Sequence, residues 1–424
     1  MTQQTAPAPK AKKPAANPQH KMLDQAVKKL VKGNSVLPIM EDILFLNGKA
    51  VVSDLENYIL VPFTVPGLDK IAIPARMFMK TLGMMPEMTA KIENSCKANF
   101  SQSPRKTGLS GDNYENFPKF PFDEETVYPV IGKLNSEDMA KLKIAEYFIS
   151  GDDLRPAMTG VHFNNKFKGK KSYICATDAH RLYYEELSTP LEESFILPSK
   201  AVDILLAFGG EWEICHSMTK ERHLLCFTRE DGLQVQTLAI DARFPDVVAV
   251  IPEDKPLVKL IASPDTLIEE IKNAIEYSNR STNQVLFCMN GKMKFYSSDV
   301  DFGFEYTSEF ENKSQFEFSF SKKFPKQYKS KDGREIRVKK ENAETIDVQF
   351  YNNESGFYED TVQVNKSELV EVDPYMNIAF NGKFFLEVLN LLPKDTAVDI
   401  SMWSPEKCAV IDGRFLIMPL MLNQ

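Results

Sequence analysis

The chain repeats one local pattern three times. In each copy a β-rich run ends on a small hydroxylated residue followed by an aspartate: Ser53-Asp54, Thr177-Asp178 and Ser298-Asp299. The three aspartates lie 124 and then 121 residues apart. A period of this length is too long for a solenoid repeat and long enough for a domain. The sequence therefore predicts one domain shape used three times.

A second repeated segment follows each aspartate. It reads as a short apolar strand, a basic residue and a helix-like run that ends on leucine. The basic residue comes 22 residues after the aspartate in the first two copies and 84 residues after it in the third, so the third copy carries an insertion. The segments are IAIPARMFMKTL (71–82), FILPSKAVDILL (195–206) and IAFNGKFFLEVL (378–389), with Arg76, Lys200 and Lys383 as the basic residues.

A length of 424 residues fits three domains. We expect an Ala/Pro/Lys-rich disordered tail and three domains, the last with a basic insertion at about 313–345. Within that insertion, segment 321–340 is basic with two aromatic residues; its composition favours a solvated loop over a DNA contact. The predicted ranges are 1–18 for the tail and 19–126, 127–254 and 255–424 for the domains.

Composition narrows the protein class. No apolar run is long enough to span a bilayer, and no secretory signal is recognisable, so the six scattered cysteines are interpreted as reduced thiols in the cytoplasm. Cys215, His216, His223 and Cys226 could suggest zinc, but adjacent strand residues point to opposite faces, which favours a plain hairpin. The net charge of −8 argues against a protein coated in nucleic acid and leaves room for one basic face.

Each copy also offers a first helix, expected at 21–33, 135–150 and 263–278, with apolar residues at three- and four-residue steps. One side of each helix should pack, and the other carries lysines. Lysines on a polar helix face are usually only solvated, but a cation recurring at one place in three copies favours a lining that contacts DNA phosphates. The predicted DNA-facing residues are Lys28, Lys32, Arg76, Lys80, Lys141, Lys143, Lys200, Lys272 and Lys383.

No reaction centre is evident in the sequence. It contains no phosphate-binding glycine loop, nucleophile elbow or zinc-protease helix. The repeated aspartates lie in separate copies, and a Ser/Thr-Asp pair at a strand end commonly forms a local turn with the backbone. His180 has no nucleophile or orienting carboxylate nearby in sequence. We therefore expect no enzyme, no catalytic residues, no metal and no cofactor.

Several segments resemble the bacterial sliding clamps, the β subunits of DNA polymerase III. They occur in the family's order across nearly the whole chain, although the family usually has glycine at the position of Ala179 and often a basic residue at that of Met421. Among them are DLRPAMTGVHF (153–163), ICATDAHRL (174–182), ARFPDVVAVIP (242–252) and FLIMPLMLN (415–423).

This resemblance implies an α+β, ring-forming chain of three clamp domains, each with two helices packed on antiparallel sheets. It also implies a cytoplasmic head-to-tail homodimer that encircles double-stranded DNA without reading its sequence and confers processivity. The expected protein partners are the DNA polymerase III catalytic subunit, the clamp loader and repair proteins with clamp-binding peptides; no membrane is involved.

The resemblance further implies two protein-binding surfaces. The dimer interface aligns loosely, near Leu109 on one side and Glu276 and Tyr277 on the other. A hydrophobic pocket for partner peptides is expected between the second and third domains. Its residues, by the resemblance, are Met158, Thr177, His180, Arg181, Leu182, Pro245, Val250, Cys408, Leu416, Met418, Pro419 and Leu420.

Two other functions remain open on the sequence. The loosely aligned interface and the insertion are compatible with a clamp-like recruitment protein that is monomeric or weakly dimeric and encoded by a mobile element or virus. A metal-dependent nuclease is the third class, and it predicts DNA cleavage that requires divalent ions.

Overall fold

The computed structural model describes residues 17–33, 35, 37–119, 128–167, 171–218, 223–311, 315–352 and 357–421. The chain divides into two units, one within residues 1–174 and 186–244 and the other comprising 175–185 and 245–424. The predicted tail lies outside the described residues except for Asn17 and Pro18, which begin the first helix. The predicted domain boundaries stay a prediction.

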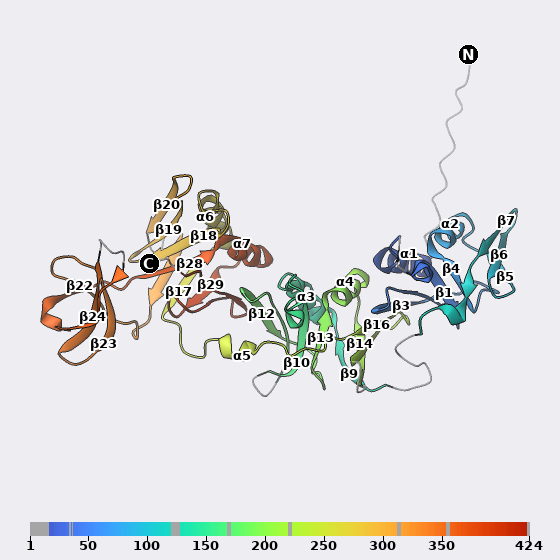
Figure 1. The fold of residues 1–424 in the computed structure, drawn as a ribbon, viewed down its shortest axis with the longest axis horizontal. Helices are drawn as coiled ribbons and strands as arrows, with labels where there is room; N and C mark the ends of the chain where they lie inside the picture. Colours follow the sequence, from blue (N-terminus) through green and yellow to red (C-terminus); the bar gives the residue numbers. More distant parts are fainter. Residues whose placement is uncertain are drawn as a thin grey trace, which may run out of the picture. The chain divides into compact units, whose positions relative to one another are not determined.

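The first repeat runs from a helix through four strands to a second helix and three more strands (Figure 1). Its elements are α1 (Pro18–Leu30), β1 (Asp42–Leu46), β2 (Lys49–Ser53), β3 (Asn57–Pro62), β4 (Ile71–Pro74), α2 (Ala75–Met84), β5 (Thr89–Glu93), β6 (Lys97–Gln102) and β7 (Arg105–Ser110), with β8 (Asp112–Asn113) after them.

The second repeat has the same order, preceded by one strand. Its elements are β9 (Val130–Leu134), α3 (Ser136–Glu146), β10 (Gly160–Phe167), β11 (Lys171–Thr177), β12 (Arg181–Glu186), β13 (Phe195–Pro198), α4 (Ser199–Phe208), β14 (Trp212–Met218), β15 (His223–Thr228) and β16 (Gln234–Leu238), followed by the short helix α5 (Val247–Val250).

The third repeat has this order too, interrupted by the insertion. Its elements are β17 (Val258–Ala262), α6 (Pro264–Glu276), β18 (Gln284–Met289), β19 (Lys292–Asp299), β20 (Phe304–Glu311), β28 (Met376–Asn381), α7 (Gly382–Leu391), β29 (Val398–Met402), β30 (Ala409–Ile411) and β31 (Phe415–Ile417). Two helices with antiparallel sheets in each repeat confirm the predicted α+β class.

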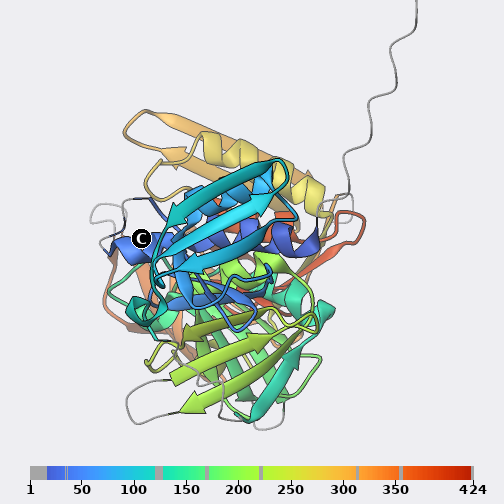
Figure 2. The same ribbon diagram turned by 90° about the vertical axis from the view of Figure 1, so that its right-hand side faces the viewer.

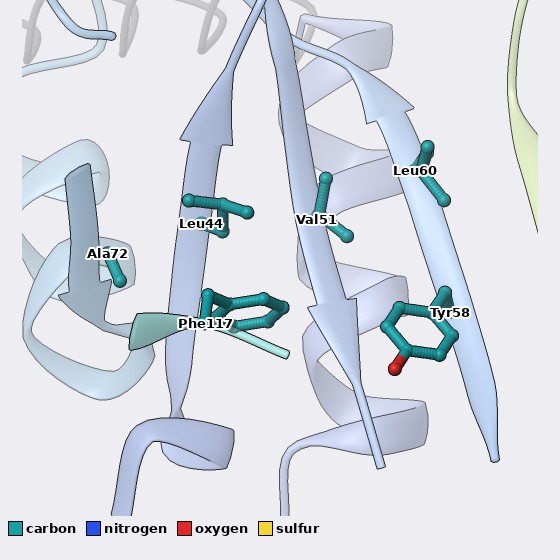
Figure 3. Close-up of a cluster of buried hydrophobic side chains, with 6 residues drawn as sticks. All are labelled: Leu44, Val51, Tyr58, Leu60, Ala72 and Phe117. Atoms are coloured by element: carbon teal, nitrogen blue, oxygen red, sulfur yellow. The ribbon is translucent and has the colours of Figure 1, made fainter. Parts of the chain in front are cut away.

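In the first unit one antiparallel sheet is buried on both faces over its strands β1 to β4. Its strand order is β8-β4-β1-β2-β3-β16-β15-β14-β9. The register places Leu44, Val51 and Leu60 side by side on one face, where Phe117 packs on them (Figure 3). The other face meets α1, and Phe45 there packs on Phe78 of α2 with ring centroids 4.6 Å apart. Strand β7 contacts α2, and in Figure 2 the strands β5 to β7 are seen in front of the helices.

In the second unit, α6 packs against α7 and along β18, β19 and β20 (Figure 2). These strands form a sheet in the order β20-β19-β18-β28. The core between sheet and helices is aromatic: Phe287 lies 5.4 Å from Phe380 and 5.0 Å from Phe385 between ring centroids. Such rings supply large buried areas, which suits a core between one sheet and two helices.

The insertion is a folded β-structure, so the expected solvated loop is wrong. After β21 (Phe316–Phe320), segment 321–340 contains β22 and most of β23, and Tyr328 is buried with Ile346 and Val348. Apolar residues alternate with lysines along these strands, a period-two pattern that the lysine count obscured. The strands are β22 (Gln327–Ser330), β23 (Ile336–Glu341), β24 (Thr345–Asn352), β25 (Phe357–Tyr358), β26 (Val362–Asn365) and β27 (Leu369–Val372).

The expected hairpin at the cysteine–histidine cluster is confirmed. In β14 and β15, Cys215 lies directly opposite Cys226, while His216 lies opposite Leu225. The ring of His216 is buried and hydrogen-bonded through Nδ1 to Glu193. Neighbouring strand residues therefore point to opposite faces here, as the sequence argument requires.

Candidate DNA-facing, partner-binding and assembly sites

Most of the predicted DNA-facing cations are exposed on helices. Lys28 forms an ion pair with Asp24 at 2.5 Å, and exposed pairs of this kind contribute little stability and dissociate readily. Such side chains are available for phosphate contacts, although a contact with DNA stays a prediction. The exposed residues are Lys28, Lys32, Arg76, Lys80, Lys143, Lys272 and Lys383.

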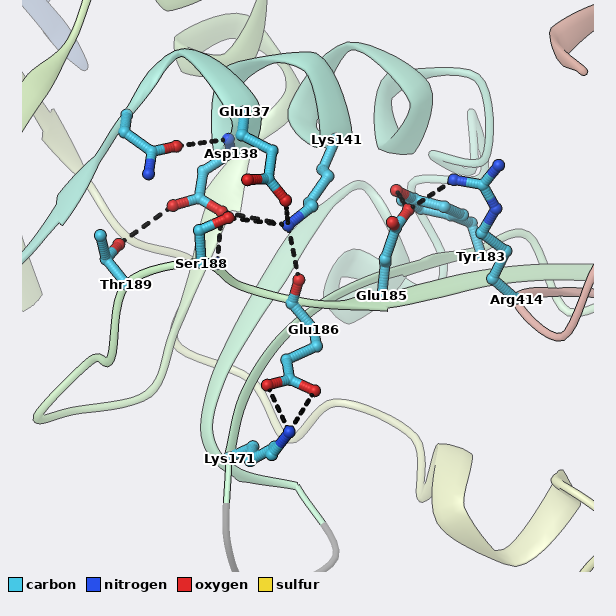
Figure 4. Close-up of polar contacts among 11 residues, drawn as sticks. Glu137, Asp138, Lys141, Lys171, Tyr183, Glu185, Glu186, Ser188, Thr189 and Arg414 are labelled. Atoms are coloured by element: carbon cyan, nitrogen blue, oxygen red, sulfur yellow. Dashed lines mark hydrogen bonds and ion pairs between the residues drawn. The ribbon is translucent and has the colours of Figure 1, made fainter. Parts of the chain in front are cut away.

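Lys141 is not on the free face of α3, so its assignment as a DNA-facing residue is wrong. Its side chain is only 10% exposed. The ammonium lies 2.7 Å from Glu137 and donates to the carbonyl of Glu186 at 2.8 Å and to the hydroxyl of Ser188 at 3.1 Å (Figure 4). The lysine therefore joins α3 to the segment after β12 within the first unit.

The neighbouring Asp138 explains why Lys141 is buried. Asp138 is fully buried and accepts from the Ser188 amide at 2.7 Å and from the Thr189 hydroxyl at 3.0 Å. A buried carboxylate is costly without a cation, and Lys141 lies 3.5 Å from it. The i,i+3 spacing of the acid and the lysine was the sequence signal for this contact.

Lys200, half-buried, lies where α4 packs on α1. Its ammonium donates to the carbonyl of Lys29 at 3.0 Å. Lys29 in turn forms an ion pair with Asp203 at 2.7 Å, and the amide of Gln25 donates to the carbonyl of Ala207. One member of the recurring set of cations thus helps to hold two repeats together.

The repeated aspartates form the expected local turns, which confirms that interpretation. Each carboxylate accepts a backbone N–H two or three residues further along the chain. Among the residues that the structure describes, no group of three or more histidine, cysteine or carboxylate side chains is placed to hold a metal ion. The bonds are 2.8 Å from Asn57 to Asp54, 2.7 Å from Arg181 to Asp178 and 3.1 Å from Asp301 to Asp299.

Among the residues predicted for the peptide pocket, Arg181 makes several side-chain contacts. Its guanidinium bonds Asp178 through Nε at 2.9 Å and Nη2 at 2.8 Å and reaches Glu387 through Nη1. The same group lies 4.7 Å from the ring centroid of Phe384, on which His180 also stacks at 5.8 Å. Two carboxylates and a ring therefore fix the orientation of this arginine.

The segment after β31 lies beside this arginine. Leu182 of β12 lies opposite Leu416 of β31, and both are buried. Beyond the strand, the amide of Met418 donates to the carbonyl of His180 at 2.9 Å, and that of Leu420 donates to Ala379 at 2.8 Å. Met418 remains 39% exposed, so the end of the chain presents an apolar side chain to solvent.

The other predicted pocket residues differ in exposure. The hydroxyl of Thr177 donates to the carbonyl of Arg181 at 2.7 Å. The thiol of Cys408 lies 3.6 Å from the carbonyl of Val250, and burial raises its pKa to about 11. Half-buried positions are Met158, in the first unit, and Pro245, Pro419 and Leu420, in the second.

Phe384 and Glu387 of α7 were missed by the sequence analysis. The first and second repeats have Met77 and Ala201 at the position of Phe384, directly after the recurring cation. No repeat-based argument could therefore select an aromatic ring there. An aromatic residue and an acid three positions apart on one helix were the available signal.

The predicted interface residues divide into two groups. Leu109 of β7 is buried in the first repeat's own core, so an interface near it would have to form through its exposed neighbours on the strand, and this part of the interface stays a prediction. Glu276 and Tyr277, at the end of α6, are exposed. The ring of Tyr277 stacks on Tyr306 of β20 at 5.5 Å, which connects this helix end with an edge strand.

Two edge strands carry opposite charges. β7 is at the edge of the sheet β5-β6-β7, and it begins with the exposed cations Arg105 and Lys106. β20 is at the edge of its sheet and carries the exposed acids Glu305 and Glu309. An edge strand presents unpaired N–H and C=O groups, which makes it competent to pair with another chain.

Comparison with solved structures shows that the fold is that of the bacterial sliding clamps. DNA polymerase III subunit beta from Pseudomonas aeruginosa matches with a TM-score of 0.68 and 16% identity over 95% of this chain and 98% of that chain. The Bartonella birtlesii sliding clamp bound to griselimycin gives 0.68 and 17% over 95% and 97%, and the Thermotoga maritima beta subunit 0.65 and 16% over 95% and 98%.

No protein-family model matches the chain, and no curated protein does. None of the described helices has the length and apolar character needed to cross a membrane.

Proposed function

We propose that this protein is a DNA sliding clamp. Two copies would join head to tail into a ring around duplex DNA and tether a replicative DNA polymerase in the cytoplasm, without catalysing a reaction. The sliding-clamp fold supports this proposal, and so do the exposed cations on the helices of all three repeats. The observation that carries it is how strands join successive repeats.

Within the chain, the last strand of each later repeat pairs with the third strand of the repeat before it. β16 pairs antiparallel with β3, and β31 pairs antiparallel with β12. The residues three and five positions after the repeated aspartate are buried at both joints: Asn57 and Ile59 at the first, Arg181 and Tyr183 at the second.

In the third repeat the same strand, β20, pairs with β19 on one side, and no described strand pairs with its other side. Counted from Asp299, the corresponding residues are Phe302 and Phe304, which are 67% and 50% exposed. The first repeat has the complementary feature, because β7, the third strand after its second helix, is an edge strand. Pairing β20 of one copy with β7 of another would repeat the observed joint, bring opposite charges together and cover both phenylalanines.

Each copy has one β20 and one β7, so two copies can form two such joints and thereby close into a ring. Head-to-tail interfaces produce closed rings if the rotation between subunits closes. The exposed cations of the helices would then contact phosphates, and affinity should not depend on base sequence. Loss of Lys141 from this set leaves cations on helices of every repeat.

A partner-binding site is proposed beside Arg181. Partner peptides, from a polymerase, a clamp loader or repair proteins, would bury apolar side chains against Met418 and Val250, which are exposed. Methionine suits a surface that accepts several sequences because its side chain adapts to different shapes. Burial of two apolar side chains gives about 1.5–3 kcal/mol each before association costs, so affinity should be about micromolar.

Encirclement can be tested without a loading factor. The variant Arg105→Cys/Glu305→Cys, with exposed Cys96 changed to Ser, is mixed with nicked circular DNA and then oxidised to join β7 and β20. A covalent dimer should stay on the circle in 1 M salt and leave once the circle is cut by a restriction enzyme. Oxidation before the DNA is added is the control and should give no retention.

Two results would contradict the proposal. A protein that sediments as a monomer at all accessible concentrations would support the clamp-like recruitment protein instead. Covalent dimers retained equally on circular and linear DNA would show binding without encirclement.

A further inference from the structure

We propose that Arg76 closes the assembly by binding the C-terminal end of α6 in a second copy, and that it is an interface residue and not a DNA contact. This inference rests on the proposed head-to-tail ring. It comes from the joint that the first unit contains, where α4 packs on α1 and Lys200 donates to the carbonyl of Lys29 at 3.0 Å.

The repeats define which residues correspond. In the first helix of each repeat, an apolar residue and an alanine three positions later are fully buried: Leu23 and Ala26, Leu142 and Ala145, Ile271 and Ala274. Three residues beyond the alanine lies Lys29 in α1, and Tyr277 at the end of α6. In the second helix the recurring cation sets the alignment, so Arg76 corresponds to Lys200.

The C-terminal end of α6 offers backbone carbonyl groups that can accept a hydrogen bond from such a donor. Backbone carbonyls in the last turn of a helix lack partners within the helix and form the negative end of its dipole. Among the described residues, no hydrogen bond reaches the carbonyl of Tyr277, and none involves the guanidinium of Arg76. Both residues are exposed, and both belong to helices adjoining the edge strands β20 and β7.

The remaining positions of the joint are also complementary. Lys29 and Asp203, which form an ion pair in α1 and α4, correspond to Tyr277 and Met79. An ion pair is thus replaced by an aromatic ring and a thioether, which attract each other through sulfur–aromatic contact. Gln25, whose amide donates to the carbonyl of Ala207, corresponds to Asn273, which is again an amide.

The charge next to the helix end favours an arginine. Lys28 precedes Lys29 in α1, whereas the acid Glu276 precedes Tyr277 in α6. Among the described residues Glu276 forms no ion pair. A guanidinium has donors for the carbonyl and the carboxylate at once, so Arg76 can bind both groups where Lys200 binds only a carbonyl.

The test is a charge-swap series measured by sedimentation of the full chain. Arg76→Glu should raise the dimer dissociation constant about a hundredfold, because it places two acids together at the interface. Arg76→Glu/Glu276→Arg should return it to within about threefold of the parent. The matched control is Lys80→Glu, one turn along the same exposed face of α2, which should leave dimerisation unchanged.

The outcomes separate this inference from the proposed function. A dimeric parent whose constant is unchanged by Arg76→Glu, or a swap that fails to restore dimerisation, would overturn the role of Arg76 and leave the ring intact. Weaker binding of a short duplex at low salt by Arg76→Glu, with an unchanged dimer dissociation constant, would assign Arg76 to DNA instead. A monomeric parent would overturn both proposals.

Discussion

β3 and β20 are the same strand of the repeat, and they differ in what covers them. β3 lies between β2 and β16, and its Ile59 is fully buried. β20 has β19 on one side and a free edge on the other, and its Phe304 is 50% exposed. The third repeat folds without this covering strand, so the joint is an addition to the domain and not a condition for its fold.

The side chains at the free edge are unusual for one that stays open. Natural edge strands are commonly protected by charges, bulges or short length. β20 carries exposed acids, but the turn before it and its first residue also present Phe302 and Phe304, stacked on each other with centroids 6.0 Å apart. Exposed apolar residues of this size indicate a surface that a partner covers. At the two joints inside the chain, the residues at the same positions are buried.

The largest expected effect is therefore on assembly. Changing Phe302 and Phe304 together to serine should raise the dimer dissociation constant about a thousandfold, since each buried phenylalanine contributes about 2 kcal/mol. Sedimentation measures the constant, and circular dichroism checks that the variant stays folded.

Val300 provides the matched control for this pair. It is 90% exposed, and its counterpart in the first repeat, Leu55, stays 45% exposed although that joint is made. Val300→Ser should leave the dimer intact. If Val300→Ser raised the dimer dissociation constant as much as the double phenylalanine variant, the effect would come from removing any apolar surface of the hairpin.

At the covered strand the same kind of change should act on folding. Ile59→Ala removes a fully buried side chain opposite Val235 of β16 and should lower the free energy of unfolding by about 2–4 kcal/mol. Urea denaturation measures this loss, and the dimer constant of the folded fraction should not change. If Ile59→Ala is as stable as the parent but no longer dimerises, the covered strand β3 contributes to assembly and not to folding, contrary to this expectation.

The sequence predicted the repeat and the strand-end turns because these depend on local patterns. The aspartate turns need only a carboxylate and the next few backbone amides, so spacing along the chain is sufficient. The basic residues were harder to place. Lys141 and Lys143 have similar neighbours in sequence, but only Lys141 meets the loop that carries Ser188 and Thr189.

The sequence could not predict which side chains are buried or contacted by segments that lie far away along the chain. Leu109 turned inward although its strand is at a sheet edge, and the contribution of α7 to the Arg181 site depends on a helix more than 200 residues away. The insertion shows a second limit: its lysine content suggested a loop, whereas the alternation of single apolar residues produced strands and a small core.

A pH effect should distinguish the first repeat from the second. Leu44 of β1 and His162 of β10 occupy the same position, packed on Phe117 and Phe244 respectively. Burial lowers the pKa of His162 to about 4, and its Nδ1 has no hydrogen-bond partner among the described residues.

The sign follows from proton binding. Between pH 4 and about 6.5 the unfolded chain binds a proton on this histidine that the folded chain does not, so stability falls as pH falls through that range. His162→Leu places the residue of the first repeat at this position. It should reduce the loss of unfolding free energy between pH 7 and pH 4.5 by about 2 kcal/mol, as measured by urea denaturation. An unchanged pH slope would show that the histidine becomes solvated in the folded protein.

The smallest effect concerns the helices of the same joints. Lys200→Met keeps the aliphatic stem and removes one hydrogen bond to the Lys29 carbonyl, so the free energy of unfolding should fall by about 1 kcal/mol without change in the dimer constant. Arg76→Gln, at the corresponding position of the open joint, should do the opposite: it should weaken the dimer and leave the melting temperature of the monomer unchanged. Differential scanning calorimetry and sedimentation of both variants separate the two quantities. If Lys200→Met instead lowers only the salt dependence of DNA binding, the cation at this position acts on phosphate in every repeat, and the joint between α1 and α4 is held by Lys29, Asp203 and Gln25 alone.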